Sequence, residues 1–169
     1  MAFTYSILVV AKRTADSDEL LEALRQLADE RPTRFTLLVP AQAAGPAARE
    51  EAEATMSAAL ERLREAGLAC EGRAGHHDPV DAVTDLWDPK EYDEIVVSTL
   101  PGAASRWLQF DVPHRIARLT GVPVRHVLAS DRREPEHTPV PERERPGVLA
   151  PLNVLTWGGG RSQRGRTSS

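Results

Sequence analysis

The chain has 169 residues, of which 41% are hydrophobic and 27% charged, as expected for a folded domain with one core and a polar surface. Its net charge of −4 gives no general reason to expect nucleic acid or an anionic membrane as the main partner, and no apolar run approaches the ~20 residues of a membrane-spanning helix. Cys70 is the single cysteine, so no intramolecular disulfide can form, and the reducing cytoplasm is the expected compartment.

The first third of the chain predicts a strand, a helix and a second strand. Residues 6–11 form a short, continuous apolar run, which is typical of a strand buried on both faces of a parallel sheet. Asp16 and Glu19 stand at the spacing of a capping box, so a helix is expected to begin there. Residues 35–39 predict the second buried strand.

The middle of the chain predicts two helices on either side of a polar strand. Pro46 fits the first turn of a long helix, and Gly67 fits its C-terminal cap. Residues 68–74 are more polar and predict a strand at a sheet edge. Pro79 then opens a helix that must stop near Asp88, because the residue before a proline avoids helical angles.

The last predicted elements are a strand at 94–99, a loop at 100–110, a helix at 111–120 and a strand at 122–128. Five strands alternating with four helices predict an α/β fold, a doubly wound five-stranded parallel sheet with strand order 3-2-1-4-5 and helices on both faces. In such a sheet ligands bind where the strand order reverses, between the first and fourth strands, at a crevice expected to gather residues 11–14, 39–42 and 98–106.

The composition changes near residue 130. We therefore expect an α/β domain over 1–129, followed by a proline- and arginine-rich tail over 130–169. Residues 147–157 form an apolar island within that tail, which we expect to dock on its own domain, on a dimer mate or on another protein. The arginines after it are more typical of a solubilising end than of a nucleic-acid site.

Four segments, in their order along the chain, resemble segments of the universal stress protein family. They are the first strand at 7–11, a glycine-to-proline segment at 75–83, the strand at 92–97 and the closing helix and strand at 115–124. The resemblance covers roughly residues 6–128. It implies a homodimer formed by antiparallel pairing of strand 122–128, and a role in stress response or regulation.

The phosphate-binding motif of that family is altered in this chain. ATP-binding members carry G-x2-G-x9-G-[ST] after the fourth strand, and the matching positions here are Ser98, Pro101, a residue near Phe110, and Asp111. Pro101 has no N–H to offer a phosphate, and Asp111 is expected to cap the next helix with its carboxylate. Lys12 stands where the family often has a nucleoside-binding aspartate. We therefore expect no ATP cofactor in the usual pose.

The predicted crevice still gathers polar groups that could hold another anion, such as a nucleoside monophosphate or an acyl phosphate. Alternatively, its cations are solvated and its hydroxyls cap backbone groups. The candidate pocket residues are Lys12, Arg13, Val39, Ser98, Thr99, Gly102, Ser105 and Arg106.

Three other clusters favour structural roles. Asp111 and His114 lie one helical turn apart and could act as an acid–base pair, but the pattern favours a helix cap at Asp111 and a surface histidine at His114. The run from His76 to Asp78 has no cysteine or third histidine near it in the sequence, and Asp78 suits a helix N-cap. The apolar group of Trp107, Leu108 and Phe110 is expected to join the core, and the alternative is that it covers the pocket or packs beneath it. No catalytic or metal-binding residue is assigned.

The sequence therefore predicts a non-enzymatic protein that acts through dimerisation and partner binding, with a degenerate nucleotide pocket. A sensor that binds a nucleotide or another small anion in an altered pose is the alternative. An enzyme that cleaves phosphoanhydrides is a third possibility.

Overall fold

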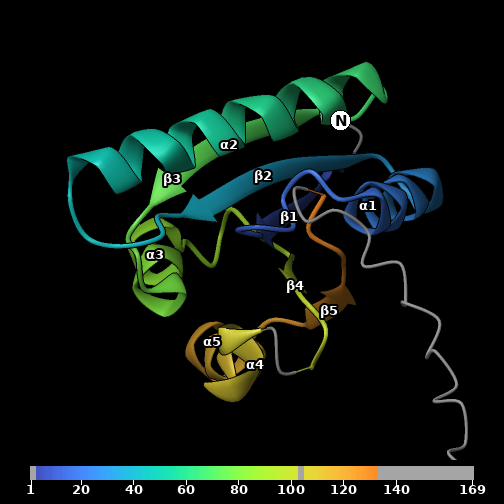
Figure 1. The fold of residues 1–169 in the computed structure, drawn as a ribbon. Helices are drawn as coiled ribbons and strands as arrows, with labels where there is room; N and C mark the ends of the chain where they lie inside the picture. The colour runs from blue at the N-terminus through green and yellow to red at the C-terminus, as the bar shows by residue number, and fades with distance from the viewer. Residues whose placement is uncertain (1–2, 103–104, 133–169) are drawn as a thin grey trace, which may run out of the picture. The chain divides into compact units, whose positions relative to one another are not determined.

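The computed structural model describes residues 3–102 and 105–132 of the chain. They form one parallel sheet of five strands in the order β3-β2-β1-β4-β5, which confirms the predicted topology. The helices lie on both faces, with α2 above the sheet and α3, α4 and α5 below it in Figure 1. The strands are β1 (Tyr5–Val10), β2 (Thr33–Pro40), β3 (Cys70–Gly75), β4 (Glu94–Thr99) and β5 (Val124–Leu128).

The described residues form five helices, one more than predicted, because the segment 100–110 that was expected to be a loop contains a short helix at 106–109. The helices are α1 (Asp18–Glu30), α2 (Pro46–Glu65), α3 (Pro79–Leu86), α4 (Arg106–Gln109) and α5 (Val112–Thr120). None of the helices in the described part of the chain is long and apolar enough to cross a membrane.

The central strands are apolar on both faces, as the continuous runs in the sequence predict. Along β1, Ile7 and Val9 pack against α1 and α2, whereas Leu8 and Val10 pack on the opposite face against α3 and α5. All four side chains have no exposed surface. Because every β1 side chain is used in packing, only the ends of this strand are free to build a site.

Three sequence-based expectations need correction, two about the ends of elements and one about the burial of Phe110. The first helix is capped by Ser17, whose Oγ accepts a hydrogen bond from the amide of Leu20, one residue later than the predicted cap at Asp16. The edge strand β3 begins at Cys70 rather than at residue 68. Phe110 is 59% exposed instead of joining the core. Of that cluster only Trp107 packs against the lower core, which is the apolar layer between the sheet and the helices α3 and α5.

Other local expectations are confirmed. The Asp78 carboxylate accepts hydrogen bonds from the amides of Val80 and Asp81, so Asp78 is the N-cap of α3. Gly121 ends α5 in the left-handed region with φ of 70°. Burial raises the pKa of the Cys70 thiol to about 11, so this thiol stays protonated and unreactive in the folded protein.

Candidate functional site

A cavity of about 170 Å³ lies at the carboxyl ends of β1 and β4, where the strand order reverses. This is the position at which doubly wound sheets bind ligands, because the loops on either side diverge there. Its lining comes from the loops after β1, β2 and β4 and from α4. The lining residues are Lys12, Arg13, Thr14, Gln42, Ser98, Thr99, Leu100, Ser105, Arg106 and Trp107.

Most of the predicted pocket residues meet at this cavity. Lys12, Arg13, Ser98, Thr99, Ser105 and Arg106 all line it. Val39 and Gly102 do not. Val39 is only 1% exposed and packs into the core against α1 and α2. Gly102 lies in the loop after β4 with φ of +54° and does not line this cavity.

The list of candidate pocket residues omits Thr14, Gln42, Leu100 and Trp107, which also line the cavity. Thr14, Gln42 and Leu100 lie four, two and one residues after the ends of β1, β2 and β4, in the segments where the sequence predicts the crevice. Trp107 could not be assigned to the cavity from the sequence, because a tryptophan between two apolar residues reads equally well as core.

The cavity is electropositive. Lys12 is half-buried, and its pKa is lowered mainly by burial and then by repulsion from the nearby Arg106 guanidinium, while Glu51 acts in the opposite direction. Neither Lys12 nor Arg106 forms an ion pair with another described residue. An anion placed between them would relieve their mutual repulsion and the cost of burying the ammonium group.

Two hydroxyl groups at the cavity have no hydrogen-bond partner within the described part of the chain. They are Thr14 Oγ1 and Ser98 Oγ, on residues that are 2% and 1% exposed. Buried hydroxyls are nearly always paired, because leaving one unpaired costs about 1–3 kcal/mol. A water molecule or a ligand atom in the cavity would supply the missing partner.

The other two hydroxyls are already engaged. Ser105 Oγ accepts a hydrogen bond from the amide of Leu108 at 3.3 Å and so caps α4. Thr99 Oγ1 lies 2.6 Å from Nε2 of His126 on the neighbouring strand β5. Burial lowers the pKa of His126, which favours the neutral imidazole. The predicted capping role therefore fits Ser105 but not Ser98.

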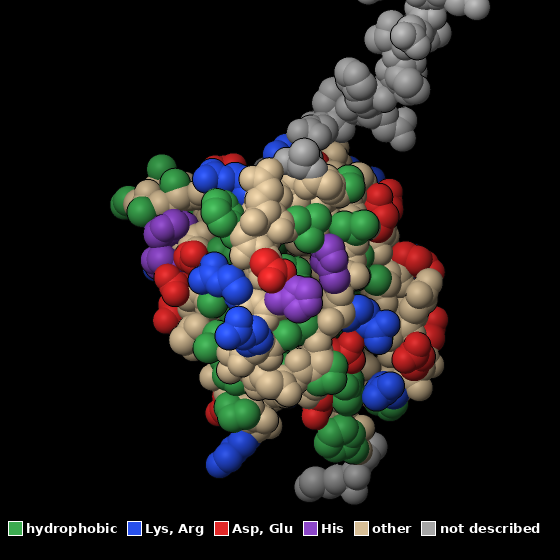
Figure 2. Space-filling view, turned by 90° about the horizontal axis from the view of Figure 1, so that it is seen from below, with side chains coloured by type: hydrophobic (Ala, Val, Ile, Leu, Met, Phe, Trp, Pro, Cys, Tyr) green, Lys and Arg blue, Asp and Glu red, His purple; other side chains and the backbone are tan. Residues whose placement is uncertain are grey.

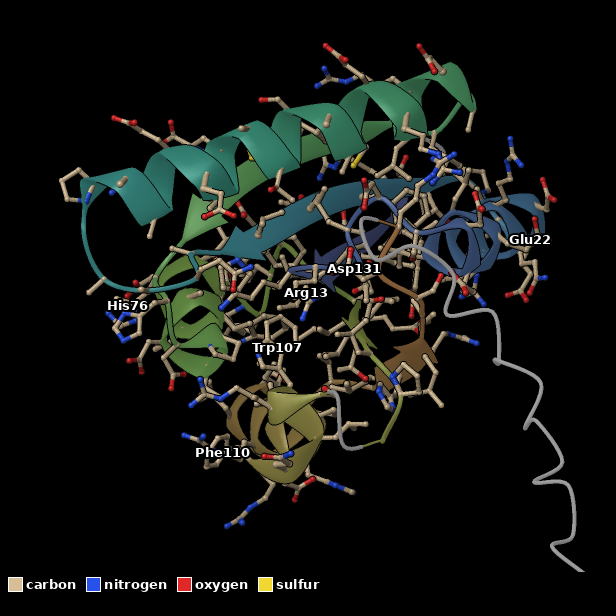
Figure 3. The ribbon with its side chains drawn as sticks, viewed as in Figure 1. Arg13, Glu22, His76, Trp107, Phe110 and Asp131 are labelled. Atoms are coloured by element: carbon tan, nitrogen blue, oxygen red, sulfur yellow. The ribbon has the colours of Figure 1, made fainter. Side chains whose placement is uncertain are left out.

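The chain beyond β5 passes close to the same cavity. The amide of Ala129 donates to the carbonyl of Thr99 at 2.9 Å, and the Asp131 carboxylate accepts a hydrogen bond from Nε of Arg13 at 2.7 Å (Figure 3). The Asp131 side chain is 3% exposed, against 43% for Arg13. The folded contacts thus continue past residue 129, and the first residues of the predicted tail help to neutralise a cation of the site.

In the described part of the loop after β4, amides that could serve a phosphate are already bonded, since Ser105 N donates to the carbonyl of Gly102 and Leu108 N donates to Ser105 Oγ. The Ser105 hydroxyl occupies one amide of the short helix α4, and α5 carries a proline in its first turn. Asp111 is at the N-cap position of α5 with φ of 51°, but its side chain makes no capping hydrogen bond, contrary to expectation. Its carboxylate instead lies 2.7 Å from Nδ1 of His114.

The Asp111–His114 pair lies on the protein surface, with side chains 66% and 82% exposed. Neither residue lines the cavity. The pair therefore cannot exchange protons directly with a ligand held between Lys12 and Arg106.

No metal centre is evident in the described ranges. Within residues 3–102 and 105–132, no group of three histidine, cysteine, aspartate or glutamate side chains is placed to hold a metal ion. Figure 2 shows acidic and basic side chains interspersed over the face seen from below, without one extended patch of a single sign among the coloured residues.

Comparison with solved structures identifies the fold. A universal stress protein in complex with cAMP has a TM-score of 0.56 and 23% identity, over 77% of this chain and all of that one. The universal stress protein of Archaeoglobus fulgidus in complex with dAMP has a TM-score of 0.56 and 18% identity, over 75% and 99%. An Arabidopsis thaliana family member with AMP bound has a TM-score of 0.51 and 16% identity, over 79% and 97%.

The chain therefore has the universal stress protein fold, as the resemblance in its sequence implied. No protein-family profile matches the sequence. A search of curated proteins gives no match either.

Proposed function

We propose that this chain is a diverged universal stress protein that acts without catalysis, in the stress response or its regulation, through dimerisation and partner binding in the cytoplasm. The fold supports the family assignment, and the altered loop after β4 is the observation that carries the functional part. Pro101 has no amide hydrogen, and Asp111 places a carboxylate where the family's motif has a serine or threonine.

The size of the first cavity supports the same conclusion. Ligand pockets usually measure about 300–1,000 Å³, whereas this cavity measures about 170 Å³. A triphosphate would also bring several negative charges into a loop that already contains Asp111. Intact ATP is therefore a poor fit.

A second candidate function is a sensor for a smaller anion, such as a nucleoside monophosphate. The unpaired Thr14 and Ser98 hydroxyls and the cations Lys12 and Arg106 favour it. The similar solved structures contain cAMP, dAMP or AMP, which are ligands of this size class. A phosphoanhydride-cleaving enzyme is less well supported, because the Asp111–His114 pair lies outside the cavity.

The sensor function predicts that Lys12→Met weakens binding of AMP about threefold to tenfold, because a half-buried cation beside the ligand phosphate is lost. Isothermal titration calorimetry at low ionic strength measures this effect. Lys90→Met is the matched control, since Lys90 is the only other lysine and is exposed in the segment before β4. Equal affinities for the two variants would contradict the sensor function, and no AMP binding by the unaltered protein would leave dimerisation and partner binding as the function.

Dimerisation is proposed to use β5, an edge strand with one free side. The amide of Ala129 bonds to Thr99 on β4, so the alternation of a parallel ladder turns the amide of Leu128 toward the open edge. The Leu128 side chain is 54% exposed. An antiparallel copy of β5 would pair with these outward amides and carbonyls.

We expect Leu128→Pro to convert the dimer to a monomer, because proline removes one outward N–H without removing a bond to β4. Leu128→Ala is the control, since it truncates the same side chain but keeps the amide. Light scattering after size exclusion, at tens of micromolar protein, distinguishes the two species. A dimer that persists in Leu128→Pro would rule out pairing through β5.

A further inference from the structure

A second and larger cavity lies on the other side of the loop between β2 and α2. Its volume is about 630 Å³, within the range of about 300–1,000 Å³ usual for small-molecule sites. It is formed by the carboxyl ends of β2 and β3, the start of α2, and α3. Gln42 lines the first cavity, whereas Ala41 and Ala43 line the second, so this loop separates two distinct spaces. The proposed function uses only the first.

The rim of the second cavity carries more basic than acidic groups. Arg49, Arg73, His76 and His77 line it, against the single carboxylate of Asp85. The imidazoles of His76 and His77 lie with ring centroids 4.1 Å apart, and Figure 3 shows His76 beside α3. The cavity thus presents the two permanent positive charges of Arg49 and Arg73 against one carboxylate.

Arg73 is the central cation of this rim. It lies on the edge strand β3 and makes no hydrogen bond or ion pair with any residue the structure describes. Nε of Arg49, by contrast, lies 3.5 Å from Oε1 of Glu53. Both side chains are exposed, so this ion pair contributes little to stability. The Arg73 guanidinium is therefore available for a bidentate interaction with a phosphate or carboxylate.

The floor of the cavity is apolar. Leu38, Ala82 and Leu86 line it, and the first two belong to the lower core. Gly75 lets α3 pack closely against this floor, because a Cβ there would lie 2.8 Å from Leu38 Cδ1 and 2.9 Å from the Ala82 side chain. An apolar base under a cationic rim is the arrangement that holds a ligand with an apolar body and an anionic group.

We propose that this cavity is a second binding site, which takes a small organic anion. The apolar body of the ligand lies on Leu38, Ala82 and Leu86, and its phosphate or carboxylate pairs with Arg73, assisted by Arg49. The site does not depend on the first cavity, and a ligand can occupy it whether or not the first cavity binds a nucleotide.

Phenyl phosphate is the test probe, titrated into the isotope-labelled full chain and followed by the amide NMR signals. The amide signals of Gly75 and Ala82 are expected to shift in a saturable way. The amide signals of Thr14 and Ser98, at the first cavity, are expected not to shift. Phenol and inorganic phosphate should each bind at least about tenfold more weakly, since each supplies only half of the recognised chemistry.

Arg73→Gln should weaken phenyl phosphate binding about tenfold. Arg118→Gln is the control, because it removes one exposed positive charge from α5 at a residue that does not line the cavity. Equal affinities for the two variants would overturn the proposal. NMR shifts confined to residues of the first cavity, or shifts that do not saturate, would also overturn it. Arg73 would then be only a solvated charge that protects a sheet edge. The comparison of phenyl phosphate with phenol needs no variant and stands if Arg73→Gln fails to fold.

Discussion

Replacing Phe35 with alanine is expected to lower the free energy of unfolding by about 3–5 kcal/mol. Phe35 lies on β2, has no exposed surface and packs in the upper core between the sheet and the helices α1 and α2. The substitution removes a whole ring and leaves a cavity that a parallel sheet, paired on both sides of β2, cannot close. Since small domains are stable by about 5–15 kcal/mol, the variant would retain little stability.

Urea unfolding followed by circular dichroism measures this difference. Phe3→Ala is the matched control, because it removes the same side chain from a position that is 75% exposed, and it should change stability by less than about 0.5 kcal/mol. A loss below about 1 kcal/mol for Phe35→Ala would mean that the upper core is not packed as described.

Replacing Asp131 with asparagine is expected to strengthen binding of a small anion such as AMP by about tenfold or more, if the first cavity is a sensor site. The Asp131 carboxylate bonds to Nε of Arg13 at 2.7 Å, and it is nearly inaccessible to solvent. It therefore acts as an internal anion that competes with any ligand for this guanidinium. A charge-assisted hydrogen bond of this kind contributes about 1.5–3 kcal/mol, which sets the size of the effect.

Calorimetry with AMP compares this variant with Asp29→Asn, which neutralises an exposed carboxylate on α1 away from the cavity lining. Circular dichroism of both variants establishes that they are folded. Unchanged or weaker AMP binding by Asp131→Asn would show that Asp131 does not restrain Arg13 against ligands.

The parts of the fold that depend on local patterns could be predicted from the sequence. The apolar runs of β1 and β4, the proline at the start of α2 and the glycine at the end of α5 each have a local physical cause. Strand order followed from the handedness of the connections, and it placed the crevice correctly between β1 and β4. The choice of Lys12, Ser98 and Arg106 as cavity residues rested on that placement.

The parts that depend on contacts distant in sequence could not be predicted. Arg13 and Asp131 are separated by 118 positions, and no local rule indicates that the start of a polar, proline-rich tail folds back to the end of β1. The prediction that the Asp111 carboxylate caps α5 was wrong for a different reason. A carboxylate before a helix usually caps it, but at a φ of 51° the backbone directs the Asp111 side chain to His114 instead.

We propose that the loop after β4 no longer supports ATP in the pose usual for the family. Calorimetric titration of the full chain with MgATP tests it most directly, with AMP titrated in parallel under the same conditions. We predict no heat of binding for MgATP at micromolar concentrations, whether or not AMP binds. A micromolar dissociation constant for MgATP, with its phosphates seated against residues 98–111 in a crystal soaked with the nucleotide, would contradict the account.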